Sequence, residues 1–169
     1  MPANPNWARW VFASVADVMK TVAVDASLPV LVEHLDERTA TFMQATDRVE
    51  IRITGPFVCE FGPDSFRLDV DVNVLLTSRY DGQKKNAYEI QRFAGLFQQA
   101  MGTAIPVWNY GDQTGDYSDS DPSSQVFIGC LEPRSDKGDE AVRVFHFGQQ
   151  TATDKNKQSM VDARYTMFL

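Results

Sequence analysis

The chain has 169 residues, of which 43% are hydrophobic and 23% are charged, the composition of a soluble globular protein large enough to bury a core of its own. Its formal net charge of -7 argues against a protein that grips nucleic acid phosphates, because that function needs clustered Lys and Arg. An acidic surface can still lie beside DNA where the DNA has to slide past it.

The opening residues MPANPNWARW lack the basic stretch and apolar core of a signal peptide, and no apolar run approaches the ~20 residues that span a membrane. We therefore expect synthesis in the cytoplasm and no membrane partner.

The first predicted element is an amphipathic helix. Asn4 and Pro5 suit a helix cap and a first helical position. The residues that then recur at helical spacing are Trp7, Trp10, Val11, Ser14, Val15, Val18, Met19 and Val22.

Two short stretches follow this helix. SLPVLVEHLDER predicts a short strand with Val30, Val32 and His34 on one side. TATFMQAT, at residues 39–46, fits either a strand or a loop.

A long β-hairpin is predicted next. The turn signal Gly62-Pro63-Asp64 separates two runs in which apolar and polar residues alternate. Gly55-Pro56 breaks or bulges the first run, since proline cannot donate to a ladder. The apolar positions are Val49, Ile51, Ile53, Phe57, Cys59 and Phe61 in the first run, and Phe66, Leu68, Val70, Val72 and Val74 in the second.

The second run leads into a central helix. At Tyr80-Asp81-Gly82 the apolar period changes from two to three or four, and Asp81 suits the turn or N-cap while Gly102 suits the C-cap. The apolar stripe can lie back on the sheet of the preceding strand, and it consists of Ile90, Phe93, Ala94, Phe97 and Met101.

The second half of the chain predicts strands joined by polar loops. TAIPVWNYG leads outward from the helix, and residues 111–124 form an acidic loop without aliphatic residues, which also lacks the Gly and closing Glu of a calcium loop. Strands are predicted in residues 124–133, 141–148 and 160–169. The last strand alternates Val161, Ala163, Tyr165, Met167 and Leu169 with polar residues, so it has to be paired or buried.

These elements predict the fold class α+β: a mixed, largely antiparallel β-sheet with an N-terminal helix and a central helix packed on it. Residues 1–169 would form a single α+β domain that carries the acidic loop 111–124.

Motifs for catalysis, cofactors or metals are not found in the sequence. It has no Gly-rich phosphate loop, G-x-S-x-G, H-E-x-x-H or C-x-x-C. Cys59 and Cys130 lie in apolar strand-like runs, which favours buried free thiols, and His34 and His146 lack ligand spacing. A Cys59–His146 dyad is a remote alternative. We therefore predict no catalytic residue, no cofactor and no metal site, and a binding or assembly module.

Two passages, LLTSRYDGQ between strand and helix and the closing VDARYTMFL, together with the order of elements, resemble the tail terminator proteins of long-tailed bacteriophages, the lambda-type neck proteins. The resemblance spans most of the chain. It implies a structural virion protein without catalysis or cofactor, a hexameric ring that stops tail-tube polymerisation and joins the tail to the head connector, and DNA passing through the lumen without specific binding. The partners would be further copies, tail-tube proteins and head-connector proteins, and the location would be the neck of the virion after synthesis in the host cytoplasm.

Two sets of residues are candidates for such a ring. The two terminal elements carry a surplus of apolar residues, and the predicted interface comprises Trp7, Trp10, Tyr165, Phe168 and Leu169. Asp69 and Asp71 lie on the polar face of their strand and predict a solvated, negatively charged lumen that repels phosphates. They could also bind a cation or share a proton, or form the wet face of an antiparallel sheet. Alternative functions are another neck, head-closure or tail-tube protein, or a non-viral ligand-binding or enzymatic α+β domain with a pocket rim formed by Trp108–Tyr110 and the acidic loop 111–124.

Overall fold

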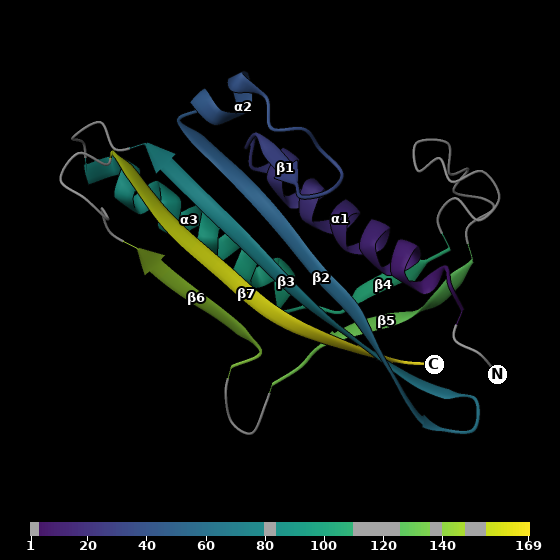
Figure 1. The fold of residues 1–169 in the computed structure, drawn as a ribbon. Coiled ribbons are helices and arrows are strands. Elements are labelled where there is room, and N and C mark those ends of the chain that lie inside the picture. The colour runs from purple at the N-terminus through teal and green to yellow at the C-terminus, as the bar shows by residue number, and fades with distance from the viewer. Residues whose placement is uncertain (1–3, 80–83, 110–125, 136–139, 148–154) are drawn as a thin grey trace.

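The computed structural model describes residues 4–79, 84–109, 126–135, 140–147 and 155–169. The predicted fold class is confirmed: a curled, mostly antiparallel sheet of seven strands carries the N-terminal and central helices on one face (Figure 1). In chain order the elements are α1 (Trp7–Asp25), β1 (Val30–Val32), α2 (Ala40–Gln44), β2 (Asp47–Gly62), β3 (Ser65–Arg79), α3 (Lys84–Met101), β4 (Ile105–Trp108), β5 (Phe127–Pro133), β6 (Val142–Phe147) and β7 (Asn156–Phe168).

Strand β7 lies in the middle of the sheet. The strand order is β1-β2-β3-β7-β5-β4, and β6 pairs with β7 beside β5. Only β1 and β2 are parallel; the other pairs are antiparallel. β7 pairs with β3 from Arg67↔Phe168 to Arg79↔Asn156, so it is held along its whole length. The prediction that the last strand is paired or buried is therefore confirmed, and deleting it would remove the centre of the sheet.

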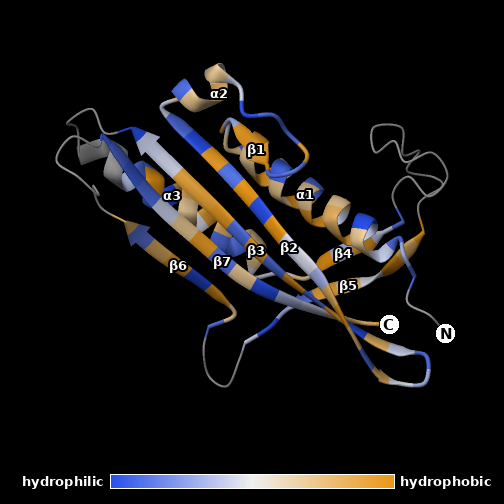
Figure 2. Cartoon of the chain, in the orientation of Figure 1, coloured by the Kyte–Doolittle hydropathy of each residue, from blue (hydrophilic) through white to orange (hydrophobic). Residues whose placement is uncertain are grey.

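The core lies between one face of this sheet and the two long helices. Because the side chains of a strand alternate between faces, the predicted period of two places every second residue of β3 and β7 in this core. The alternation is visible along β2, β3 and β7 (Figure 2). The buried residues are Leu68, Val70, Val72 and Val74 of β3, Val161, Ala163, Tyr165 and Met167 of β7, and Ile90, Phe93, Ala94, Phe97 and Met101 of α3.

Tyr165 joins the central strand to the end of the central helix. Its side chain is completely buried, and its phenol donates a 2.8 Å hydrogen bond to the main-chain oxygen of Met101. That carbonyl belongs to the last turn of α3, where no intrahelical donor remains. Burial raises the pKa of Tyr165, so the neutral, donating form is the one that the fold keeps.

Two boundaries near the N-terminus differ from the predictions. Helix α1 begins at Trp7 with Asn6 as its N-cap, while the Asn4 side chain accepts from the Asn6 amide at 2.9 Å and so forms a turn before the helix. β1 ends at Val32, and His34 lies beyond it with φ 70°, outside any strand.

Two predictions for short apolar segments are wrong. Residues 39–46 contain a short helix, α2, whose N-cap Thr39 accepts from the Phe42 amide at 3.2 Å. TAIPVWNYG contains the strand β4, which pairs with β5 and buries Ile105 and Val107, so it does not simply lead outward. In both cases the segment is too short for periodicity to identify its structure.

The thiols are free, as predicted, but they are not buried. Cys59 is exposed, and Cys130 is half-buried. Cys59 lies on β2 and His146 on β6, at opposite edges of the sheet, and the His146 ring is within 2.7 Å of the Ser159 hydroxyl. The remote alternative of a Cys59–His146 dyad is therefore wrong. The acidic loop 111–124 and the turn at Tyr80-Asp81-Gly82 lie outside the described residues.

Changing Tyr165 to Phe tests the link between β7 and α3. It removes the phenol that satisfies the Met101 carbonyl while keeping the ring in the core. We expect the free energy of unfolding to fall by about 1–2 kcal/mol in urea titrations at pH 7. Tyr88, which is 68% exposed, gives the matched control: Tyr88→Phe should change stability by less than about 0.5 kcal/mol. Equal effects of the two substitutions would contradict this role of Tyr165.

The stabilities of the same two variants should also depend differently on pH in the alkaline range. An unfolded tyrosine ionises near pH 10, whereas the raised pKa keeps Tyr165 protonated in the folded state. The unfolded state thus releases this proton first, and this contribution to stability is lost as pH rises from about 10 toward the folded pKa. Between pH 9 and 11 the wild type should lose stability more steeply than Tyr165→Phe, while Tyr88→Phe should follow the wild type.

Candidate interaction surface

The candidate surface is the outer face of the sheet, defined here as the face opposite α1 and α3. In Figure 1 α3 passes behind β3 and β7 and α1 runs alongside β2, which leaves the outer face of β3 and β7 toward the viewer. The alternate residues of β3 and β7 that are absent from the core form its centre, and register places them directly opposite one another. These pairs are Arg67 and Phe168, Asp69 and Thr166, Asp71 and Arg164, Asn73 and Asp162, and Leu75 and Met160.

Asp69 is the most highly connected acid of this face. One oxygen accepts from the Thr166 hydroxyl at 2.7 Å and lies 3.6 Å from a guanidinium nitrogen of Arg134. The other oxygen lies 3.0 Å from Nε of Arg67. The Asp69 side chain is only 17% exposed, so much of its contact with water is replaced by these cations and the hydroxyl.

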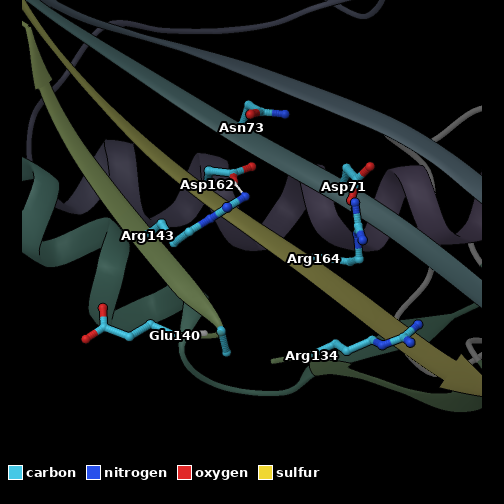
Figure 3. A pocket seen from close by; sticks show the side chains of 8 residues that line it. Asp71, Asn73, Arg134, Glu140, Arg143, Asp162 and Arg164 are labelled. Carbon is cyan, nitrogen blue, oxygen red and sulfur yellow. Dashed lines mark hydrogen bonds and ion pairs between the residues drawn. The ribbon is translucent and has the colours of Figure 1, made fainter. Parts of the chain in front are cut away.

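The neighbouring acids are paired in the same way. Asp71 accepts from Nε of Arg164 at 2.8 Å across the β3–β7 ladder. Asp162 accepts from Arg143 across the β7–β6 ladder. Figure 3 shows both arginines pointing toward their carboxylates. Each acid on β3 or β7 therefore has a cross-strand cation, which favours the sheet.

These residues surround a small polar pocket of about 250 Å³. Its charged lining balances, with three arginines facing three carboxylates, and the charged groups largely bind one another. Two of the three carboxylates, Asp71 and Asp162, are each bound by an arginine of the same lining. It is lined by Asp71, Asn73, Arg134, Glu140, Ala141, Arg143, Asp162 and Arg164 (Figure 3).

The expectation of uncompensated negative charge at Asp69 and Asp71 is therefore wrong, whereas their assignment to the lumen of a ring stays a prediction. Both carboxylates point away from the core, as expected, but Arg67 of β3, Arg164 of β7 and Arg134, directly after β5, neutralise them. The polar residues of β3 were visible in the sequence, whereas the arginines come from strands far along the chain and are brought beside them only by the sheet order. A surface with balanced charges neither strongly attracts nor strongly repels phosphates.

One end of the outer face is apolar and exposed. It belongs to the part of the β2–β3 hairpin from Phe57 to Arg67, called the arm below, which projects past the rest of the sheet (Figure 1). Phe57 is 53% exposed and Phe61 is 61% exposed. Phe168 of β7, 65% exposed, meets the Phe61 ring edge-on with centroids 5.8 Å apart. Val58, on the opposite face of the arm, is also 47% exposed.

The other end of the outer face carries a second apolar group. Leu75, Met160 and Phe145 are neighbours in register across β3, β7 and β6, and Phe147 follows two residues along β6. Phe145 and Phe147 are 39% and 41% exposed. The outer face thus has a charge-paired centre between two apolar ends.

The predicted interface residues lie in different environments. Trp10 and Tyr165 are buried within this chain, so they are core residues and cannot meet a partner. Trp7 is half-buried and packs edge-on against Phe66 at 5.0 Å, and Leu169 exchanges two main-chain hydrogen bonds with Phe66. Of the five, only Phe168 is largely exposed.

The exposed residues of the arm were missed as a surface because their alternation also fits a buried hairpin. The available signal was length. A strand of 16 residues extends about 50 Å, whereas a helix of 19 residues extends about 28 Å, so neither helix can cover the whole inner face of β2, where Val58 lies. Phe57 and Phe61 lie on the outer face, which neither helix covers at any length.

Within the described part of the chain, no group of His, Cys, Asp and Glu is arranged to hold a metal ion, and no helix is long and apolar enough to cross a membrane. Trp108, predicted as part of a pocket rim, packs edge-on against Phe127 at 5.4 Å, and Tyr110 lies outside the described residues. No protein-family model matches the chain, and a search of curated proteins finds no match.

Replacing Asp69 with Lys tests whether the charge-paired centre stabilises the fold. Lysine would remove the acceptor of Thr166 and place a third cation beside Arg67 and Arg134, so we expect a loss of about 1–3 kcal/mol in urea unfolding. Asp69→Asn keeps an acceptor and should lose less. Glu37→Lys, on an exposed residue away from this centre, is the control for a change of two charges. Equal stability of Asp69→Lys and Glu37→Lys would show that the centre is an ordinary wet surface.

Proposed function

We propose that the chain is a structural virion protein, a phage tail terminator that assembles into a hexameric ring, ends the tail tube and joins it to the head connector. The observation that carries this proposal is the exposed arm. On its outer face Phe57 and Phe61, with Phe168 beside them, expose on the order of 350 Å² of apolar surface in one place. Contiguous apolar patches of this size on a single chain mark interaction sites.

The positions of the two apolar ends favour a ring over a two-fold dimer. They lie at opposite ends of one face and are built from different residues, so a contact that joins one end to the other is heterologous. A heterologous contact that repeats under rotation closes into a ring. The charge-paired centre needs no partner, since its acids already have cations.

The electrostatics of the chain suit a channel that DNA passes through without specific binding. The net charge is -7, and the described outer face balances its acids with arginines. Neither feature provides the clustered cations that would hold phosphates. The proposal needs no catalysis and no cofactor. Its partners are further copies of the chain, the tail tube and the head connector, with assembly in the host cytoplasm and a final place in the virion neck.

Light scattering after size exclusion, with negative-stain microscopy, tests this function. We expect the wild type to form rings of about six times 19.0 kDa. The double variant Phe61→Ser, Phe168→Ser should keep its fold and lose at least about tenfold in the assembly constant, because these rings are exposed in the single chain. Added to growing tail tubes of its own virus, the wild type should stop their elongation.

The matched control is Val24→Ser. Val24 is 66% exposed but lies on α1, on the other side of the sheet, so its loss should leave the rings intact. A wild type that stays monomeric at every concentration, or rings that leave tube elongation unchanged, would contradict the proposal.

A further inference from the structure

Two edges of the sheet lack a partner strand among the described residues. β1 pairs with β2 only over Val49 to Ile51, so the edge of β2 in the arm is open. At the opposite side, β6 pairs with β7 along one edge, and its other edge is open among the described strands. Open edges present unpaired main-chain N–H and C=O groups that template another strand.

The arm has little of the usual protection of an open edge. Natural edges are blocked by charged residues, proline or a bulge. Here one bulge at Gly55-Pro56 lies before the arm and a second irregularity between Glu60 and Gly62 lies near its tip. The stretch between them carries Phe57 and Val58, and Glu60 is the one charge on this edge. An open edge with exposed apolar side chains favours pairing with another strand.

We propose that the open edge of the arm pairs with β6 of a second copy of this chain, which makes one sheet continuous across the subunit boundary. This specifies the contact within the ring proposed above, and so rests in part on that function.

The strand directions fit this pairing. β2 is antiparallel to β3, β3 to β7, and β7 to β6, so β6 runs opposite to β2. If two copies join edge to edge with their outer faces on the same side, β6 of one copy meets β2 of the next in antiparallel orientation. Antiparallel pairing needs no crossover and is slightly more stable per residue than parallel pairing.

The side chains fit as well. Phe145 and Phe147 of β6 lie on the outer face, opposite Met160 and Gln158 of β7. Phe57 and Phe61 lie on the same face in the arm, opposite Asp69 and beside Phe168. Edge pairing would therefore bring the aromatic residues of both strands together on one surface, where cross-strand aromatic pairs stabilise a sheet.

The area of the contact is consistent with a second copy as the occupant. Both faces of the arm together with Phe168 of β7 expose on the order of 400 Å² of apolar side chain, about half of the ~800 Å² per partner in a stable interface. Phe145 and Phe147 of the neighbour, and the main-chain groups of both edges, supply further buried area. Each copy uses both edges in a closed ring, so the contact is made twice per chain.

The register predicts a stagger between neighbours. Along β7, Phe57 of the arm projects onto Thr166, whereas Phe145 projects onto Met160. The difference is six residues, or about 20 Å along the strands. Neighbouring copies must therefore be shifted along the strand direction, and a ring closes only with strands inclined to its axis, as shear requires in a closed barrel.

Cysteine cross-linking tests the pairing, because Cys59 is already exposed in the middle of the arm. In a Cys130→Ala background, single cysteines are introduced at successive positions of β6 and oxidised, and covalent oligomers are counted on denaturing gels. Arg143→Cys, Phe145→Cys and Phe147→Cys place the thiol on the outer face with Cys59. We expect at least one of them to cross-link about tenfold more than His146→Cys, an exposed position on the opposite face of the same strand.

A Cys59→Ser version of each variant should give no covalent oligomers. Cross-linking at outer-face positions in closed rings supports the inference. Rings without any Cys59 cross-link, or equal cross-linking at His146→Cys, overturn the pairing and leave the proposed function standing. The outer-face pattern in open filaments supports the pairing and contradicts a terminator. A monomer without cross-links overturns both.

Discussion

The structure depends on one buried layer, the inner face of β3 and β7 under α3 and α1. β7 supplies the middle of this layer because it pairs with β3 along its length and with β5 and β6 on its other side. Tyr165 ties it to the last turn of α3 through its hydrogen bond to the Met101 carbonyl. Since an antiparallel strand alternates its side chains, burying this face fixes which residues form the outer face.

The outer face divides into regions that do and do not need a partner. In its centre, acids and arginines from different strands neutralise one another within the chain. At its ends, phenylalanines remain exposed because they lie on the face opposite the two long helices, where no described element covers them. The exposed apolar residues that lack a partner within the chain thus lie mainly at the arm and at β6, on opposite edges of the sheet.

The sequence predicted the layered core well because its signal is local. The period of two in Phe66–Val74 and the period of three to four in Ile90–Met101 each identify a buried face without knowledge of the rest of the chain. The short segments α2 and β4 could not be identified, because five and four residues are too few to show a period.

The candidate surface was harder to predict because it depends on strand order. The sequence places Asp69 and Asp71 on a polar face, but their neutralisation by Arg134 and Arg164 follows from β7 pairing with β3 and from β5, which Arg134 directly follows, pairing with β7. It also treats Tyr165 and Phe168 alike, as apolar residues of one terminal strand. Their alternation puts Tyr165 in the core and Phe168 outside, and only the sheet shows which face is covered.

Amide hydrogen exchange on the wild-type protein, measured from dilute to concentrated solution, tests the central claim that a second copy covers the arm. The open-edge amides of Phe57 to Phe61 should exchange quickly in the dilute protein and become protected, together with the open edge of β6, as assembly proceeds. The centre of β7 should be protected at every concentration. Arm amides that exchange equally fast in dilute and concentrated protein would contradict the account.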